Sequence, residues 1–152
     1  MKIRIELEEN AEEEVILRCR ELTPKIMELQ RILTEAANRS GQIILYKNDT
    51  EYYLEKSKLL FFETENSMVM AHTANEVFET KLKLYELEEV LGGSFLRISK
   101  SAIVNVDKIY AIRKSLTASS TIEFQGTHKQ IYVSRAYYRV LKEKLEEKRL
   151  EL

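Results

Sequence analysis

Residues 95–113 read FLRISKSAIVNVDKIYAIR, and the rest of the chain is best understood from this stretch. Apolar residues such as Ile98 and Ile103 recur through it and can pack a β-rich core. Cations stand between them, including Arg97 and Lys100, together with short polar side chains. Apolar anchors with interleaved cations suit a rigid surface that faces phosphate. A buried strand with a solvated basic face has the same composition, so the residues alone leave both interpretations open.

The charge of the chain is unevenly distributed, although its net charge is only -1. Residues 95–142 hold nine Lys or Arg against two Asp or Glu, a net charge of +7. Residues 1–94 hold twelve against nineteen, a net charge of -7. A long basic segment in a balanced chain is typical of a protein that binds nucleic acid. The alternative is that the acidic and basic parts neutralise each other within the folded chain.

The length of 152 residues suits one ordinary domain with a short accessory element, and 44% hydrophobic residues support a core. No apolar run approaches the length needed to span a bilayer. The N-terminus turns acidic, unlike a secretory signal. The single Cys19 cannot form an internal disulfide. These features favour a reducing compartment, and we expect a cytoplasmic protein.

The sequence holds no pattern of catalytic residues. A Gly-x-Ser-x-Gly motif and a phosphate-binding glycine loop are both missing from it. His72 and His128 are far apart, and neither has a second His or a Cys at metal-ligand spacing. Cys19 stands in an apolar pattern that favours a small core residue over a nucleophile. We therefore expect neither an enzyme nor a metal or cofactor site.

The first forty residues form an extension with its own patterns. Ile3, Ile5 and Leu7 alternate with charged residues, which predicts a half-buried strand. Asn10 then predicts a helix start, because acidic residues follow it in the first turn. Thr23-Pro24 is a second helix start, so we expect two helices or one kinked helix.

An apolar stripe runs through these predicted helices at alternating spacings of four and three. Its members are Val15, Cys19, Leu22, Ile26, Leu29 and Leu33. Such a stripe is commonly covered by a sheet of the same chain. The regular spacing also suits a helical seam between two copies of the chain, and both interpretations stay open.

Residues 38–41 are a polar break, after which the pattern favours strands. We expect a hairpin of 42–47 and 50–55, strands at 59–65, 68–73, 77–81 and 108–114, and a second hairpin of 121–125 and 129–134. Residues 82–91 have helical spacing and end at Gly92-Gly93. A final helix is expected at 136–150, with a charged end.

The blocks of this pattern resemble the LytTR family of bacterial DNA-binding domains. The signature is carried by Phe95, Arg97, Ser101, Ile103, Val104, Asn105 and Ile109, and the flanking blocks by LFFE at 60–63, LYEL at 84–87 and VSR at 133–135. The resemblance covers about residues 42–145. It implies a mainly β fold, an elongated antiparallel sheet domain with short helices. We therefore divide the chain into the extension, 1–40, and a LytTR-like domain, 41–152.

The same resemblance implies a sequence-specific transcriptional regulator whose loops enter successive major grooves of double-stranded DNA. The residues that match base-contacting positions are Ser67, Lys100 and Arg135. The residues expected to contact the DNA backbone are Asn66, Arg97, Ser101, Lys114, Lys129, Ser134 and Arg139. Asn105 is expected to stabilise a turn through its side-chain amide instead.

Further partners are expected on different grounds. The N-terminal helices are a possible homodimer contact, and the resemblance alone implies a regulatory membrane protein. The alternative function is a protein-interaction module, an anti-activator or adaptor, whose basic face binds an acidic partner. Binding that ignores DNA sequence, together with a stable protein complex, would favour that alternative.

Overall fold

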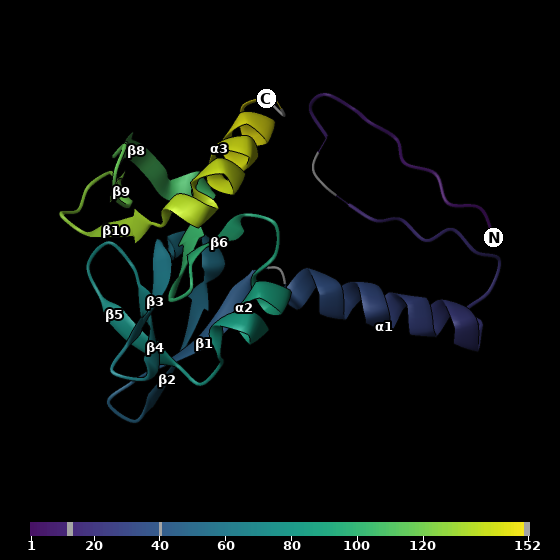
Figure 1. The fold of residues 1–152 in the computed structure, drawn as a ribbon. Helices are drawn as coiled ribbons and strands as arrows, with labels where there is room; N and C mark the ends of the chain where they lie inside the picture. The colour runs from purple at the N-terminus through teal and green to yellow at the C-terminus, as the bar shows by residue number, and fades with distance from the viewer. Residues whose placement is uncertain (12–13, 40, 151–152) are drawn as a thin grey trace. The chain divides into compact units, whose positions relative to one another are not determined.

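The computed structural model describes residues 1–11, 14–39 and 41–150. The chain divides into two compact units, Met1–Ala36 and Ala37–Leu152, which are described separately. Figure 1 shows helix α1 (Pro24–Arg39) in the N-terminal part of the chain and two sheets with two further helices after it.

The first unit differs from its sequence-based prediction. Residues 1–11 and 14–23 contain neither helix nor strand, so the predicted strand at Ile3–Leu7 is wrong. The predicted helix from Asn10 is wrong as well wherever it falls on these residues, and its positions 12–13 lie outside the described residues. A strand needs a ladder partner, and the part of this unit that is described offers none. A short helix without a core to pack against is marginal, because its first turn is costly to form. Only the second helix start is confirmed: α1 begins at Pro24, and the Ile26 amide donates to Thr23 Oγ1 at 3.3 Å.

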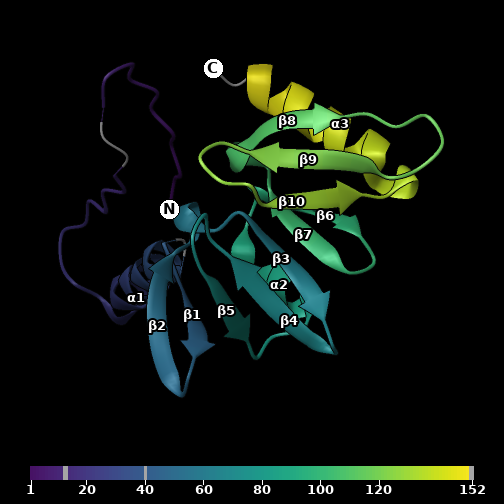
Figure 2. The same cartoon turned by 90° about the vertical axis from the view of Figure 1, so that its left-hand side faces the viewer.

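A seven-stranded antiparallel sheet forms the centre of the second unit (Figures 1 and 2). Its strands are β1 (Gln42–Lys47), β2 (Thr50–Glu55), β3 (Phe61–Glu65), β4 (Met68–His72), β5 (Val77–Thr80), β6 (Phe95–Ser99) and β7 (Ala102–Asn105). The order across the sheet is β2-β1-β5-β4-β3-β7-β6, so the predicted first hairpin lies at one edge. The short 3-10 helices η1 (Lys56–Lys58) and η2 (Val106–Lys108) follow β2 and β7.

A second, three-stranded sheet has the order β10-β9-β8. It consists of β8 (Ile109–Arg113), β9 (Ser120–Phe124) and β10 (Gln130–Val133), as Figure 2 shows. The remaining helices are α2 (Leu84–Leu91) and α3 (Arg135–Leu150). Gly92 ends α2 with φ +87°, a conformation that favours glycine, as the sequence predicts. The mainly β, antiparallel fold class is confirmed.

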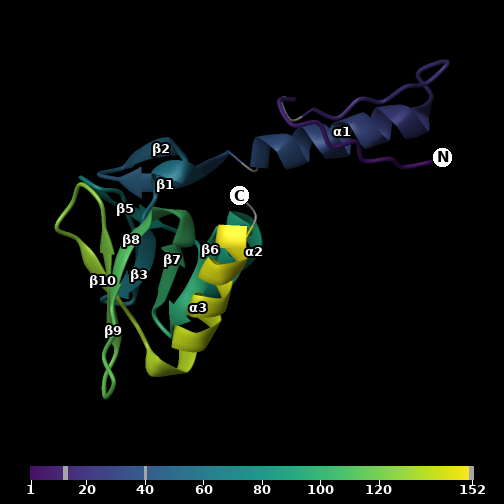
Figure 3. The same cartoon turned by 90° about the horizontal axis from the view of Figure 1, so that it is seen from above.

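Alternating strand residues divide the core into two clusters, one for each face of the large sheet. Phe62 and Phe78 pack with the buried face of α2, represented by Leu87. Phe61 points the other way and packs with Phe124 of the small sheet and with α3. Figure 3 shows α3 and the small sheet beside the large sheet. Adjacent residues of β3 are therefore buried on opposite faces of the sheet. This explains why the sequence of this strand begins with a continuous apolar run instead of an alternating pattern.

Two tight turns close hairpins of the large sheet. Asn48 and Asp49 connect β1 to β2 with φ of 50° and 62°, and Asn66 and Ser67 connect β3 to β4 with φ of 49° and 68°. Two successive positive φ values define the turn type that matches the twist of paired strands, and Asn and Asp tolerate it better than other residues except glycine. The turn positions are those predicted from the sequence, and the second of them presents Ser67.

Asn105 joins three segments of the core and is only 2% exposed. Its side-chain amide donates to the Leu59 carbonyl at 2.9 Å. Its side-chain oxygen accepts from the Asp107 amide at 3.1 Å, at the start of η2. The turn-stabilising role predicted for this signature residue is confirmed.

Candidate nucleic-acid interface

Three segments that are distant in the sequence meet at one place in the second unit. They are the β3–β4 turn, the β6–β7 turn and the start of α3, and we call residues 66–67, 100–101 and 134–135 the loop cluster. The Thr64 amide donates to the Ser101 carbonyl at 2.9 Å, which ties the first turn to the second. The Ser134 amide donates to the Ile98 carbonyl at 2.9 Å, which ties the start of α3 to β6.

All three residues predicted to contact bases, Ser67, Lys100 and Arg135, are exposed in this cluster. The structure therefore brings together the sequence-predicted positions, each on a different connection. Arg135 is the first residue of α3, where the Tyr137 amide donates to the Ser134 carbonyl at 3.1 Å. A cation is unfavourable beside the positive end of a helix, so the fold itself does not account for an arginine there.

Arg97 supports the β6–β7 turn from within the fold. Its guanidinium donates to the carbonyls of Ser99, at 2.8 Å, and Lys100. A third contact, 3.2 Å long, joins it to the carboxylate of Glu88 on α2, and the side chain is 22% exposed. The pairing register of β6 with β7 shifts at this point. The side chain thus holds the turn that presents Lys100, and its expected phosphate contact stays a prediction.

The other cations predicted to contact phosphate differ in how firmly they are held. Arg139 is highly exposed and lies 3.2 Å from Glu143, one turn along α3. Lys114 lies over the Tyr138 ring, with Nζ 5.4 Å from the centroid. Arg139 thus carries its charge on the exposed surface of α3, and Lys114 carries its charge beside that helix.

Lys129 is held by a cluster that the sequence did not reveal. Its ammonium donates to the Glu76 carbonyl at 2.8 Å and lies 3.3 Å from His72 Nδ1. His72 Nε2 is buried and lies 3.4 Å from a carboxylate oxygen of Glu65. Glu63 completes the group, and its donor atoms and those of Glu65 and His72 lie within 4.8 Å of one another. The Lys129 ammonium offsets part of the negative charge that the two carboxylates bring to this group.

Burial governs the ionisation of this cluster. It lowers the pKa of His72, and the nearby Lys129 ammonium lowers that pKa further. Burial, assisted by the Glu65 charge, raises the pKa of Glu63. It also lowers the pKa of Lys129. No sequence spacing indicates the cluster, because β3, β4 and the β9–β10 loop contribute to it from positions far apart in the chain.

We expect the protein to lose stability as the pH falls below 6.5, the ordinary pKa of His72. The unfolded chain then binds a proton that the folded His72 resists, so stability declines until the lower folded pKa is reached. One such proton changes the free energy of unfolding by at most about 1.4 kcal/mol per pH unit. Denaturant unfolding between pH 5 and 8, followed by circular dichroism, measures this dependence.

A His72→Gln variant is the control for this pH dependence. The raised pKa of Glu63 acts in the opposite direction, because the folded carboxyl takes up its proton at a higher pH than the unfolded one. Both proteins contain Glu63, so the difference between their pH dependences of stability gives the contribution of His72. Equal slopes in the two proteins over this range would contradict the assignment.

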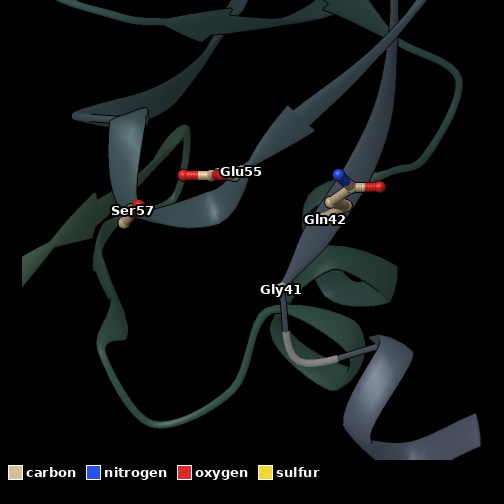
Figure 4. Close-up of a pocket in the computed structure, with 4 residues that line it drawn as sticks. All are labelled: Gly41, Gln42, Glu55 and Ser57. Atoms are coloured by element: carbon tan, nitrogen blue, oxygen red, sulfur yellow. The ribbon is translucent and has the colours of Figure 1, made fainter.

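One further hollow lies among the described residues of the second unit. A shallow hollow is lined by Gly41, Gln42, Glu55 and Ser57 (Figure 4), which include a single carboxylate. Across the described parts of the chain, no helix has the length and apolar character required to cross a membrane.

An antiparallel β domain with exposed cations and hydroxyls gathered on its loops suits a nucleic-acid-binding domain. The sequence profile of the LytTr DNA-binding domain family matches residues 37–146. Uncharacterised HTH-type transcriptional regulators of Staphylococcus aureus strains NCTC 8325 and COL are each 34% identical to the chain over 127 residues. These alignments cover 80% of this chain and 84% of each relative.

The fold is also similar to a solved LytTr DNA-binding domain from Bacillus cereus. The TM-score is 0.64 at 24% sequence identity, over 69% of this chain and 96% of that domain. The chain belongs to the LytTr DNA-binding domain family. The family resemblance read from residues 95–113 and their flanking blocks is therefore confirmed.

Proposed function

We propose that the protein is a sequence-specific transcriptional regulator whose loop cluster reads DNA in successive major grooves. Lys100 and Arg135 would donate hydrogen bonds to guanine O6 or N7, and Ser67 would contact a base from the β3–β4 turn. Two observations support the proposal: the chain belongs to a DNA-binding family, and its three loops are tied together by backbone hydrogen bonds.

Contacts with the DNA backbone would supply affinity without sequence preference. Asn66, Ser101 and Ser134 stand beside the base-reading positions and would contact the sugar-phosphate backbone, together with Lys114 and Arg139. In the described residues, consecutive helices are always separated by strands, so loops rather than a pair of adjacent helices would carry recognition. We assign Arg97 primarily to positioning, because its guanidinium is already bonded to the turn.

Two further proposals concern where the protein acts and whether it forms a dimer. A regulator that binds DNA would act in the cytoplasm of a bacterium. The first unit would join two copies, and Ile26, Leu29 and Leu33 of the predicted stripe lie half-buried on α1. A regulatory membrane protein as partner stays a prediction of the family resemblance alone.

Fluorescence anisotropy tests the central proposal. The purified protein is titrated onto a labelled duplex from upstream of its own gene and onto a scrambled duplex of equal composition, across a salt series. We expect preference for the native sequence and a steep fall of affinity with salt. Equal, weak binding to both duplexes would contradict sequence-specific recognition and favour the protein-interaction alternative.

The Arg97→Ala variant distinguishes a positioning role from a phosphate contact. We expect it to weaken specific binding by about tenfold, roughly 1.4 kcal/mol, because the β6–β7 turn loses its anchor. The slope of log affinity against log salt should stay unchanged, whereas loss of a phosphate contact lowers it by about 1. Arg139→Ala, which removes an exposed cation, is the control that should flatten the slope. A flattened slope for Arg97→Ala would show that its guanidinium contacts phosphate.

A further inference from the structure

The N-terminal segment presents apolar side chains that the described residues of its unit leave exposed. Ile3, Ile5 and Leu7 are 91%, 83% and 95% exposed, and the described residues around them form neither helix nor strand. On the opposite side, Arg4 and Glu6 are paired at 2.6 Å and are also exposed. Strict alternation of apolar and charged residues is the pattern of a strand with one buried face. The segment therefore has the sequence of a strand but lacks its neighbour.

We propose that this neighbour is the same segment of a second copy, paired antiparallel about a two-fold axis at Ile5. In that register Ile5 faces Ile5, and Ile3 faces Leu7 of the other copy. Arg4 then faces Glu6, and Lys2 faces Glu8, each twice because of the symmetry. One face becomes wholly apolar and the other consists of opposite charges directly across the strands. Both kinds of cross-strand pair stabilise a sheet.

Other pairings of the segment oppose like charges. A parallel pair of copies places Arg4 against Arg4 and Lys2 against Lys2. Pairing with residues 14–20 of the same chain, which form neither helix nor strand, also fails. With Ile5 opposite Leu17, Arg4 faces Arg18, and the remaining registers that keep the apolar residues together likewise set like charges against each other. Like charges directly opposite destabilise a ladder, so the antiparallel pair of copies is favoured.

The rest of the first unit contains apolar helix residues that would cover the apolar face of a two-stranded ribbon. Such a ribbon is marginal in water unless a helix or further strands cover its apolar face. Residues 24–36 of helix α1 belong to the same unit and include the half-buried Ile26, Leu29 and Leu33 beside the exposed Met27. Each copy would therefore bring its own apolar helix face to the ribbon. This places the primary contact between copies in the strand rather than in the helices that the sequence suggested.

The dimer would give the proposed function its second half-site. A two-fold pair carries two DNA-binding domains, which suits a site made of two related halves. Linking two domains also raises the local concentration of the second once the first is bound. This consequence depends on the proposed DNA recognition, whereas the pairing of the strands does not.

Charge reversal in the full-length chain tests the register. Sedimentation equilibrium gives the dimer dissociation constant of the wild type, Arg4→Glu, Glu6→Arg and the double variant Arg4→Glu/Glu6→Arg. We expect each single variant to weaken the dimer by about tenfold or more, since like charges then face each other twice. The double variant exchanges both charges and should return close to the wild-type value. Lys25→Glu, an exposed reversal on α1, is the matched control and should leave the dimer unchanged.

Disulfide trapping tests the position of the two-fold axis, with Cys19→Ser as the background. Ile5→Cys should cross-link two copies under mild oxidation, because residues facing each other in an antiparallel pair have Cα atoms about 4.5–5.5 Å apart. Ile3→Cys should not, because two Ile3 residues would be about 13 Å apart along the ribbon.

Three results would overturn the proposal: a monomer at all concentrations, a double charge variant no better than the single ones, or equal cross-linking at positions 3 and 5. Circular dichroism melts of each variant confirm that the second unit stays folded. Because these measurements contain no DNA, they can fail while sequence-specific binding succeeds, and the reverse also holds.

Discussion

Replacing Arg135 with alanine is expected to weaken binding to a specific site by about 1–3 kcal/mol, with a much smaller loss on a scrambled duplex. Arg135 is exposed at the first position of α3 and lies in the loop cluster, beside a helix start that is bonded to β6. A guanidinium that forms two parallel hydrogen bonds with guanine is the commonest specific contact between proteins and DNA. Loss of this guanidinium is therefore expected to reduce the preference for the specific sequence more than the affinity for DNA in general.

Arg139→Ala is the matched control, since it removes the same side chain one helical turn further along α3. We expect that variant to weaken all duplexes alike, because Arg139 lies outside the loop cluster and pairs with Glu143. Lys100→Ala, in the β6–β7 turn, should behave like Arg135→Ala. Anisotropy titrations on specific and scrambled duplexes at two salt concentrations separate the outcomes. Equal losses on both duplexes for Arg135→Ala would reduce its role to a backbone contact.

Replacing Asn105 with alanine is expected to lower the free energy of unfolding by about 2–3 kcal/mol. The side chain is 2% exposed, and its amide serves the Leu59 carbonyl and the Asp107 amide at once. Alanine leaves the buried Leu59 carbonyl without its donor and the partly buried Asp107 amide without its acceptor. Removing one side of a buried hydrogen bond costs the desolvation of the group left behind. Urea unfolding followed by circular dichroism measures the change.

Gln42→Ala is the control for Asn105, because it removes an exposed amide from the first residue of β1. We expect that variant to change stability by less than about 0.5 kcal/mol. DNA affinity per folded molecule should be unchanged in Asn105→Ala well below its melting temperature, since the side chain serves the fold. A stability change as small as that of Gln42→Ala would contradict the structural role of Asn105.

Local patterns in the sequence were sufficient for most of the second unit. The alternation in 42–47 and 50–55 and the Asn-Asp turn between them predict the first hairpin with its observed bounds. Gly92 predicts the end of α2, and residues 95–113 with their flanking blocks identify the family. These features depend on neighbours close in the chain, where side-chain periodicity and turn geometry act directly.

The first unit departed from its prediction because local patterns do not specify a partner. Ile3, Ile5 and Leu7 have the alternation of a strand, yet they are exposed and unpaired in the single chain. Residues 14–22 share a helical stripe with α1, but consecutive apolar residues and arginines at alternate positions suit an extended chain equally well. The periodicity of apolar residues predicts which face of a segment is apolar. Which other segment covers that face depends on tertiary packing.

By itself, the sequence determined the family and most of the strands and turns of the second unit, and it predicted which residues would read DNA. Tertiary structure alone decided that residues 67, 100 and 135 lie on one loop cluster, that Arg97 holds the β6–β7 turn, and that His72 meets Glu65 and Lys129. Such contacts join residues tens of positions apart. They follow from strand order and from which face each side chain takes, and neither leaves a periodic signal in the sequence.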